Sequence, residues 1–385
     1  MRGKLLRMTV FLALLLLFLR GGAETVQARE AEPESIQTGE WEDIDRFLKE
    51  NAGNAGKSIS FTELVKALMA GEGKKAGRMI LDAARQGIFG EFERGGRVSA
   101  QLLALGLIGA VFAGFAEIFA GGRMSETGFF MTYLMSFAVL ATSFFESVSI
   151  AAGVLEKQVL FMKVLIPSYF AAVAWAGAAA ASAAWYEVLL FLIAGVQWLY
   201  LKALLPLVRI YIMLVLAGNM AKEDMLSKMT ELLKTVVQWG SRSLVGLVVG
   251  FHLIQGMVLP YADAVKTAGV QKLLQVIPGV GAGAGAVTKL ILGSGVLIKN
   301  TMGAAAVVIL ILLSLMPLLK LLVLLVLYRA VAAALQPVAD KRLVGCISGV
   351  ADAQRLLLGI AASGLLLFVI TIALICLGTN VSYLA

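Results

Sequence analysis

Charged residues are scarce in this sequence, and their scarcity excludes a simple soluble protein. Only 15% of the 385 residues are Asp, Glu, Lys or Arg, whereas a globular domain has about 25%. Hydrophobic residues make up 59% of the chain, and the mean hydropathy is +0.87. A chain with so few charges cannot cover a water-facing surface. We therefore predict an all-α, polytopic integral membrane protein with about six to eight transmembrane helices.

Histidine and cysteine are also nearly absent, which leaves little from which to build a metal or catalytic centre. The sequence contains one histidine, His252, and two cysteines, Cys346 and Cys376. Neither cysteine lies in a Cys-x-x-Cys pair, and one imidazole cannot assemble a zinc or iron site. No hydrolase signature is present. We therefore expect no catalytic residue, no metal and no cofactor.

Basic residues are in excess but are not clustered. The 33 Lys and Arg exceed the 25 Asp and Glu, for a net charge of +8, and they lie singly between apolar runs. A nucleic-acid-binding face gathers its basic residues in one patch, so no nucleic-acid partner is expected. In a polytopic protein, scattered Lys and Arg mark cytoplasmic loops. We assign the basic linkers 219–242 and 329–355 to the cytoplasm, which leaves the C-terminus outside.

Residues 1–28 have the three parts of a secretory signal peptide. A basic start precedes an apolar core from Met8 to Leu19, and small or polar residues then lead to Ala28. The core has about 12 residues, fewer than the roughly 20 that a spanning helix needs. We therefore predict cleavage after Ala28, in preference to an uncleaved anchor, and a mature N-terminus outside the cytoplasm.

Residues 29–97 form the predicted extracytoplasmic region. Its first part, 29–50, carries eight acidic residues against three bases, and we expect a solvated arm. Ser60-Phe61-Thr62-Glu63 has the spacing of a capping box, and an apolar stripe follows over 61–69. This pattern predicts an amphipathic helix, with a second one over 74–92. The two helices could pack together, lie on the membrane surface or dock on a partner.

The rest of the chain, 98–385, is the predicted membrane domain. Its apolar stretches are long enough to cross a bilayer. They are 98–120, 129–151, 159–181, 185–217, 236–259, 303–328 and 356–378. The fourth stretch fits either one long tilted helix or two short ones broken at Pro206. The third fits either a span or a packed interfacial helix.

The predicted orientation contains one conflict. An outside N-terminus and a cytoplasmic 219–242 linker require an odd number of crossings among the first four apolar stretches. Either one of those stretches does not span, or one splits in two. We assign the anomaly to the stretch 159–181 or to the stretch 185–217.

Small residues gather between the two basic linkers, at 278–286. Gly279, Gly281 and Ala284 match the G-x-G-x-x-A form of a dinucleotide loop, but no strand precedes them and no βαβ unit surrounds them. Small residues at this density more often allow close backbone packing. The more specific alternative is a re-entrant segment over 278–298. Pro278, Gly279 and Gly281 are therefore candidate pathway or packing residues.

Ionisable residues inside the stretch 185–217 are the other pathway candidates. Glu187, Lys202 and Arg209 would fall within about 60° of one another on a continuous helix, at about 100° per residue. Charges within a bilayer are costly and usually functional, so these three form a candidate polar stripe. The alternative is that they snorkel from the ends of two short helices.

Short motifs follow one another in a defined order along the chain. They are Ser60-Phe61-Thr62-Glu63-Leu64, Leu165-Ile166-Pro167-Ser168-Tyr169, Lys266-Thr267-Ala268, Ile277-Pro278-Gly279-Val280-Gly281, Leu297-Ile298-Lys299-Asn300, Tyr328-Arg329-Ala330, Ala333-Ala334-Leu335-Gln336-Pro337 and Asp340-Lys341-Arg342. With these motifs in this order, the sequence resembles the stage III sporulation protein AE family of endospore-forming bacteria. The resemblance covers nearly the whole chain, from the signal peptide to the last span.

The resemblance implies a non-enzymatic membrane subunit of a secretion-like channel complex that connects mother cell and forespore and is required for spore development. The implied location is the mother-cell membrane around the forespore. The implied partners are membrane lipid, other membrane proteins of the sporulation complex and a cytoplasmic secretion-type ATPase. The alternative function is a stand-alone small-solute permease, with the stripe of Glu187, Lys202 and Arg209 and the Gly279 region as its pathway.

Overall fold

Helices alone make up the regular structure of the described chain. The computed structural model describes residues 38–51, 60–70, 78, 96–111, 123–175, 179–220, 226–275 and 281–378. Its long helices are α6 (Arg123–Trp175), α7 (Ala179–Trp198), α8 (Leu205–Met220), α9 (Ser227–Gln275), α10 (Gly281–Leu335) and α11 (Lys341–Gly378). The shorter ones are α2 (Thr38–Asn51), α4 (Phe61–Met69) and the helix Gly96–Val111. The predicted all-α fold is confirmed for these residues.

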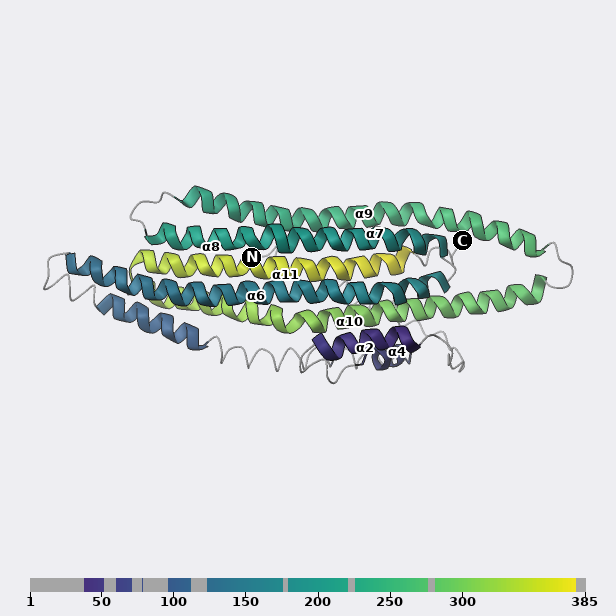
Figure 1. The fold of residues 1–385 in the computed structure, drawn as a ribbon, viewed down its shortest axis with the longest axis horizontal. Helices are drawn as coiled ribbons and strands as arrows, with labels where there is room; N and C mark the ends of the chain where they lie inside the picture. The colour runs from purple at the N-terminus through teal and green to yellow at the C-terminus, as the bar shows by residue number, and fades with distance from the viewer. Residues whose placement is uncertain are drawn as a thin grey trace.

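The long helices run side by side in one elongated bundle (Figure 1). The helices α6, α7 with α8, α9, α10 and α11 alternate in direction along the bundle axis. The helix α11 lies among the others and contacts α6, α8, α9 and α10. The short helices α2 and α4 pack against each other and against α6 and α10. One connected hydrophobic core joins all of these elements.

The long helices exceed the thickness of a bilayer. The helices α6 and α10 have 53 and 55 residues, which at 1.5 Å per residue gives about 80 Å each. The hydrocarbon core of a membrane is about 30 Å thick. Even with a strong tilt, such helices extend beyond the hydrocarbon on at least one side.

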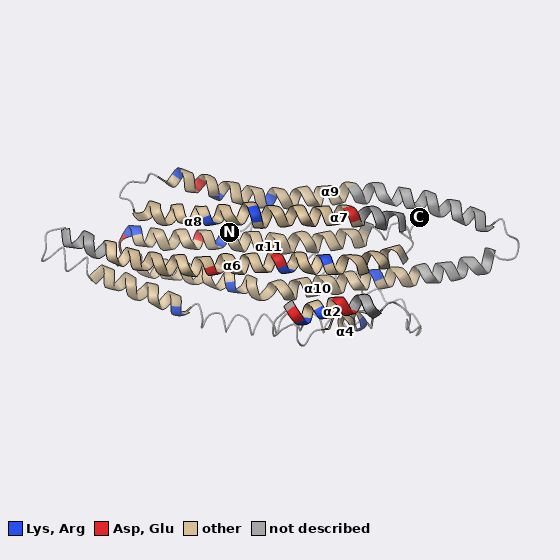
Figure 2. Cartoon of the chain, in the orientation of Figure 1, with Lys and Arg blue, Asp and Glu red and all other residues tan. Residues whose placement is uncertain are grey.

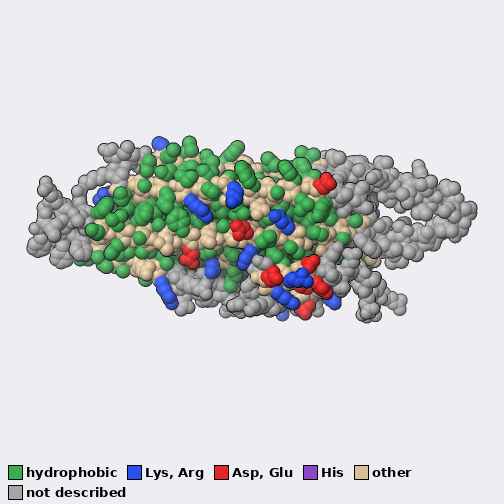
Figure 3. All heavy atoms as spheres, in the orientation of Figure 1, with side chains coloured by type: hydrophobic (Ala, Val, Ile, Leu, Met, Phe, Trp, Pro, Cys, Tyr) green, Lys and Arg blue, Asp and Glu red, His purple; other side chains and the backbone are tan. Residues whose placement is uncertain are grey.

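Four described helical segments are long and apolar enough to cross a membrane. They are Phe130–Ala174, Tyr186–Met220, Gly293–Leu335 and Lys341–Leu377. Large apolar side chains are exposed along the bundle, among them Phe191 at 82% and Leu247 at 70%, and hydrophobic atoms cover most of the described part of the face drawn in Figure 3. Such a surface fits contact with lipid or protein rather than with water. The chain is therefore a multi-pass membrane protein.

The predicted span 129–151 and the part of 159–181 up to Trp175 lie on one helix. The helix α6 runs unbroken from Arg123 to Trp175, and Pro167 is inside it. Proline removes one backbone donor and crowds the preceding turn, but Pro167 is on the exposed side of α6, where the helix can open slightly toward its surroundings. Up to Trp175, the stretch 159–181 therefore belongs to the same helix as 129–151 and is not a separate span.

Pro206 does not break the next helix either. Between α7 and α8 the chain forms a π-helical turn, η1 (Leu199–Leu204), and the Leu205 N–H donates to the Tyr200 carbonyl five residues earlier. Pro206 has no N–H to offer the Lys202 carbonyl, and the wider π-turn moves that carbonyl away from the proline ring. Of the two alternatives for 185–217, the structure has the continuous helix.

Both basic linkers lie at the same end of the bundle. The helices α8 and α10 end, and α9 and α11 begin, at the end of the bundle where α6 begins, whereas α9 ends and α10 begins at the opposite end (Figure 1). Residues 281–298, the described part of the proposed re-entrant segment, form the first turns of α10. Residues 278–280 and the signal peptide lie outside the described residues.

The start of α4 is capped by Ser60, as the predicted capping box requires for its first half. Ser60 is the N-cap of α4, and its Oγ accepts a hydrogen bond from the Glu63 N–H at 3.3 Å. Asp45 of α2 adds three contacts, because its carboxylate accepts from the Ser60 hydroxyl at 3.0 Å, the Phe61 N–H at 2.5 Å and the Thr62 hydroxyl at 2.8 Å. The end of α4 is thus fixed to α2.

The prediction of a solvated arm over 29–50 is wrong for its described part. Residues from Thr38 onward form α2, and Ile44, Phe47 and Leu48 of this helix are buried. The Phe47 ring lies 6.0 Å from the Phe161 ring of α6, centroid to centroid. Glu42, Asp43 and Glu50 are exposed. The acid-rich sequence of α2 is therefore that of an amphipathic helix and not of a solvated arm.

Candidate functional site in the polar contacts between helices

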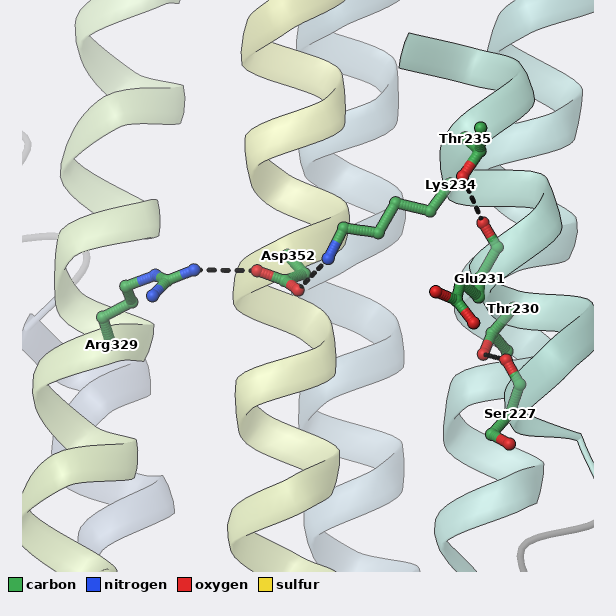
Figure 4. Close-up of polar contacts among 7 residues, drawn as sticks. All are labelled: Ser227, Thr230, Glu231, Lys234, Thr235, Arg329 and Asp352. Atoms are coloured by element: carbon green, nitrogen blue, oxygen red, sulfur yellow. Dashed lines mark hydrogen bonds and ion pairs between the residues drawn. The ribbon is translucent and has the colours of Figure 1, made fainter. Parts of the chain in front are cut away.

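A charged network joins three helices near the basic end of the bundle (Figure 4). Asp352 of α11 lies between Lys234 of α9 and Arg329 of α10. One carboxylate oxygen is 2.5 Å from the Lys234 Nζ, and the other is 2.8 Å from an Arg329 nitrogen. The Asp352 side chain is 25% exposed, so water screens the pairs only in part. One carboxylate therefore holds α9 and α10 against α11.

A second polar cluster lies beside the π-turn. The Tyr200 hydroxyl of η1 is 2.9 Å from the Ser363 Oγ of α11, and the Ser241 Oγ of α9 is 2.7 Å from the same atom. Ser363 also donates to the Ile360 carbonyl at 2.8 Å. π-Turns inside α-helices are frequent at functional sites. Here the π-turn sets the position from which Tyr200 reaches α11.

Further along the bundle, buried polar side chains pair across the core. The Gln158 Nε2 of α6 donates to the Ser314 Oγ of α10 at 2.9 Å. The Tyr169 hydroxyl of α6 lies 2.8 Å from the Cys376 Sγ of α11, and the His252 Nε2 lies 3.1 Å from the Thr371 Oγ1. Polar contacts between membrane helices fix the register of the packing. Each contact forms only when its two helices are in this relative position, so together the contacts specify how the helices pack.

The predicted pathway residues of the fourth apolar stretch do not line the interior. Glu187 on α7, Lys202 in η1 and Arg209 on α8 are all exposed. The π-turn η1 contains Lys202 and lies between Glu187 and Arg209, and the three side chains are exposed on both sides of it.

The other predicted site residues are placed only in part. Gly281 begins α10, and Ala28, Pro278 and Gly279 lie outside the described residues. Within the described chain, no three His, Cys, Asp or Glu side chains come together as metal ligands. Cys346 and Cys376 are both buried free thiols.

Sequence reasoning missed the charged network. Lys234, Arg329 and Asp352 were each assigned to basic linkers, but Lys234 and Asp352 are 118 positions apart. No local pattern reports a pairing across that separation. The linker 329–355 contains two acids, Asp340 and Asp352. The available signal was the place of Asp352 just before the apolar stretch 356–378, because an acid near the apolar boundary needs a cationic partner.

Fold and contacts together define a multi-pass, all-α membrane protein whose helices are joined by polar contacts. Comparison with known proteins narrows this class. The family model for stage III sporulation protein AE matches residues 59–379. The chain belongs to the stage III sporulation protein AE family.

A curated relative supports the assignment. The stage III sporulation protein AE of Bacillus subtilis (strain 168) is 22% identical over 330 residues, which cover 86% of this chain and 79% of that protein. No solved structure matches the chain. Membership of the family implies a role in stage III of sporulation.

Proposed function

We propose that the chain is a non-enzymatic membrane subunit of a secretion-like channel complex that connects mother cell and forespore and is required for spore development. The observation that carries the proposal is the family match over residues 59–379. The proposed location is the mother-cell membrane around the forespore. The proposed partners are membrane lipid, the other membrane proteins of the complex and a cytoplasmic secretion-type ATPase.

The length of the bundle supports a role within an assembly. Helices of about 80 Å cannot be covered by a hydrocarbon layer of about 30 Å. Apolar side chains are nevertheless exposed over much of that length, from Phe130 on α6 to Trp198 on α7 and Leu377 on α11. Exposed apolar surface outside the hydrocarbon needs a protein neighbour.

The continuity of α6 supports an outside N-terminus. With α6 as one crossing and α7 with α8 as another, the proposal takes the apolar stretch predicted at 98–120, which includes most of the described helix Gly96–Val111, as the third. Three is an odd number, as an outside N-terminus and cytoplasmic basic linkers require. In this orientation α2 and α4 face the intermembrane space, and the basic end faces the mother-cell cytoplasm.

The first experiment is a pull-down of the tagged full-length chain, gently extracted from sporulating cells, with identification of the co-purifying proteins. Recovery of a secretion-type ATPase and other sporulation membrane proteins is expected. Recovery of the chain alone would contradict the complex. Substrate-coupled transport by the chain reconstituted alone, abolished by Lys202→Ala or Arg209→Ala, would favour the permease.

A charge-reversal pair tests where the ATPase binds. Lys228 and Lys341 are exposed near the basic end, whereas Lys49 and Lys66 are exposed on α2 and α4. The double variant Lys228→Glu and Lys341→Glu should lose the ATPase and keep the membrane partners. The matched control, Lys49→Glu and Lys66→Glu, should keep both. ATPase loss in the control alone would reverse the proposed orientation.

A further inference from the structure

A groove between α9 and α11 lies next to the cluster of Tyr200, Ser241 and Ser363. It encloses about 320 Å³. Two arginines line it, Arg242 of α9 and Arg355 of α11, together with the polar Gln238 and Ser241. Both arginines are exposed. The groove therefore presents two positive charges from two different helices beside hydrogen-bonding groups.

These arginines have no counter-ion within the described chain. Neither forms an ion pair with any residue that the structure describes. The acid nearest in sequence is Asp352, three residues before Arg355, and its two oxygens are already taken by Lys234 and Arg329. Two uncompensated guanidinium groups in one groove attract an anion, and their planar donor geometry suits a phosphate.

The other half of the groove is apolar. Val245 of α9 and Leu366 of α11 line it. Farther along α9, Leu247 and Phe251 are exposed, at 70% and 41%. An apolar surface therefore leads away from the arginines along the bundle. A small inorganic anion makes no favourable contact with such a surface, whereas an acyl chain can pack against it.

The arginines lie at the edge of a bilayer-sized apolar segment. Residues 356–377 of α11 contain no charged residue, and these 22 residues extend about 33 Å as helix, close to the roughly 30 Å of a hydrocarbon core. Arg355 immediately precedes this segment. Trp239, three residues before Arg242, is 71% exposed, and tryptophan is enriched at the membrane–water interface.

We propose that this groove binds an anionic phospholipid. The phosphate lies between Arg242 and Arg355, Gln238 adds a donor, and an acyl chain follows Val245 and Leu366. The bound lipid bridges α9 and α11 next to the π-turn. The inference does not depend on the sporulation complex, because it rests on the groove alone.

The test measures lipid retention by the full-length protein purified in neutral detergent. Labelled phosphatidylglycerol and phosphatidylcholine with identical acyl chains are offered in competition. Two cations near a membrane surface give an expected preference for phosphatidylglycerol of about tenfold or more. The double variant Arg242→Gln and Arg355→Gln should reduce the preference to parity. Equal retention of both lipids by the unmodified protein, or a preference that survives in the double variant, would overturn the proposal.

Two further arms separate the alternatives. The control Lys49→Gln and Arg97→Gln removes two exposed charges far from the groove and should keep the preference. The variant Arg242→Lys and Arg355→Lys keeps the charge and should retain most of it, so a folding defect in the glutamine variant cannot imitate the result. Inorganic phosphate at millimolar concentration should not displace the lipid; if it does, the groove is a free-anion site and the lipid assignment fails.

Discussion

Asp352 has an influence beyond its own helix, because its two oxygens contact side chains from two different neighbours. Lys234 and Arg329 on their own would leave two cations between packed helices, and the carboxylate compensates both. The opposite case is found in the groove nearby, where Arg242 and Arg355 have no such acid among the described residues. The helices α9 and α11 therefore take part in two sets of charges: one that Asp352 neutralises, and one, in the groove, that no described acid neutralises.

Replacing Asp352 tests the network. Asp352→Asn keeps the shape but removes the charge, and it should lower the free energy of unfolding by about 1 kcal/mol, a modest value because the pairs are partly exposed. Asp340→Asn is the matched control, since Asp340 pairs only locally with Arg342 at 3.4 Å. The Asp340 Oδ1 also accepts from the Arg342 N–H at the start of α11, at 2.8 Å, and asparagine can take over this capping bond. Denaturant titration in detergent measures both; equal losses would show that the network adds nothing.

Whether a contact could be predicted from the sequence depends on how far apart its two residues lie along the chain. The Ser60–Glu63 cap could be read from the sequence because both partners lie within one turn. In α2, the apolar spacing of Ile44, Phe47 and Leu48 was equally local, but the surrounding acids were taken as a sign of a solvated arm. Contacts such as Gln158 with Ser314 join residues 156 positions apart, and no local pattern encodes them.

At the scale of elements, α11 is fitted to its neighbours through glycines. A Cβ on Gly349 would collide with the Val215 side chain of α8, and one on Gly345 would come within 2.5 Å of the Asn219 Oδ1. The two glycines are one helical turn apart, so α8 approaches α11 closely along one face. By contrast, a Cβ on Gly153 of α6 would meet nothing within 4 Å.

This difference predicts opposite outcomes for the same substitution. Gly349→Ala should destabilise the protein by about 1–3 kcal/mol through overpacking, whereas Gly153→Ala should be neutral or stabilising by up to about 1 kcal/mol, because alanine favours the helix. Adding Val215→Ala to Gly349→Ala should recover part of the loss. Thermal unfolding in detergent ranks the variants, and a Gly349→Ala protein as stable as the parent would refute the close approach.

Helix existence was easier to predict than helix ends. Glu156 and Lys157 lie between the predicted spans 129–151 and 159–181, yet α6 is continuous through them and Glu156 is exposed. The adjacent Gln158 is buried and bonded to Ser314. Polar residues interrupt an apolar run in sequence without interrupting the helix, because each can find water or a partner. Because of these polar residues, the sequence predicted two spans where the structure has one long helix.

At the scale of the whole molecule, the orientation is open to direct measurement. The two native cysteines are buried, so they should contribute little background to thiol labelling. When the chain is produced in vegetative cells, its extracytoplasmic side faces the medium; there Lys66→Cys on α4 should react with a membrane-impermeant maleimide in intact protoplasts, and Lys228→Cys at the basic end should react only after permeabilisation. The reverse pattern would place the basic end outside and contradict the positive-inside assignment.

The π-turn at Leu199–Leu204 has a consequence for the comparison of related sequences. Relative to a regular helix, it accommodates one extra residue without disturbing the packing on either side. Evolution can therefore add or remove a residue here at low cost, whereas an indel elsewhere in the same helix would turn its buried face outward. An alignment of relatives should show a one-residue gap at this turn, and relatives that lack the extra residue should have no proline at the position of Pro206, because a regular α-turn would place the proline ring against the carbonyl four residues earlier.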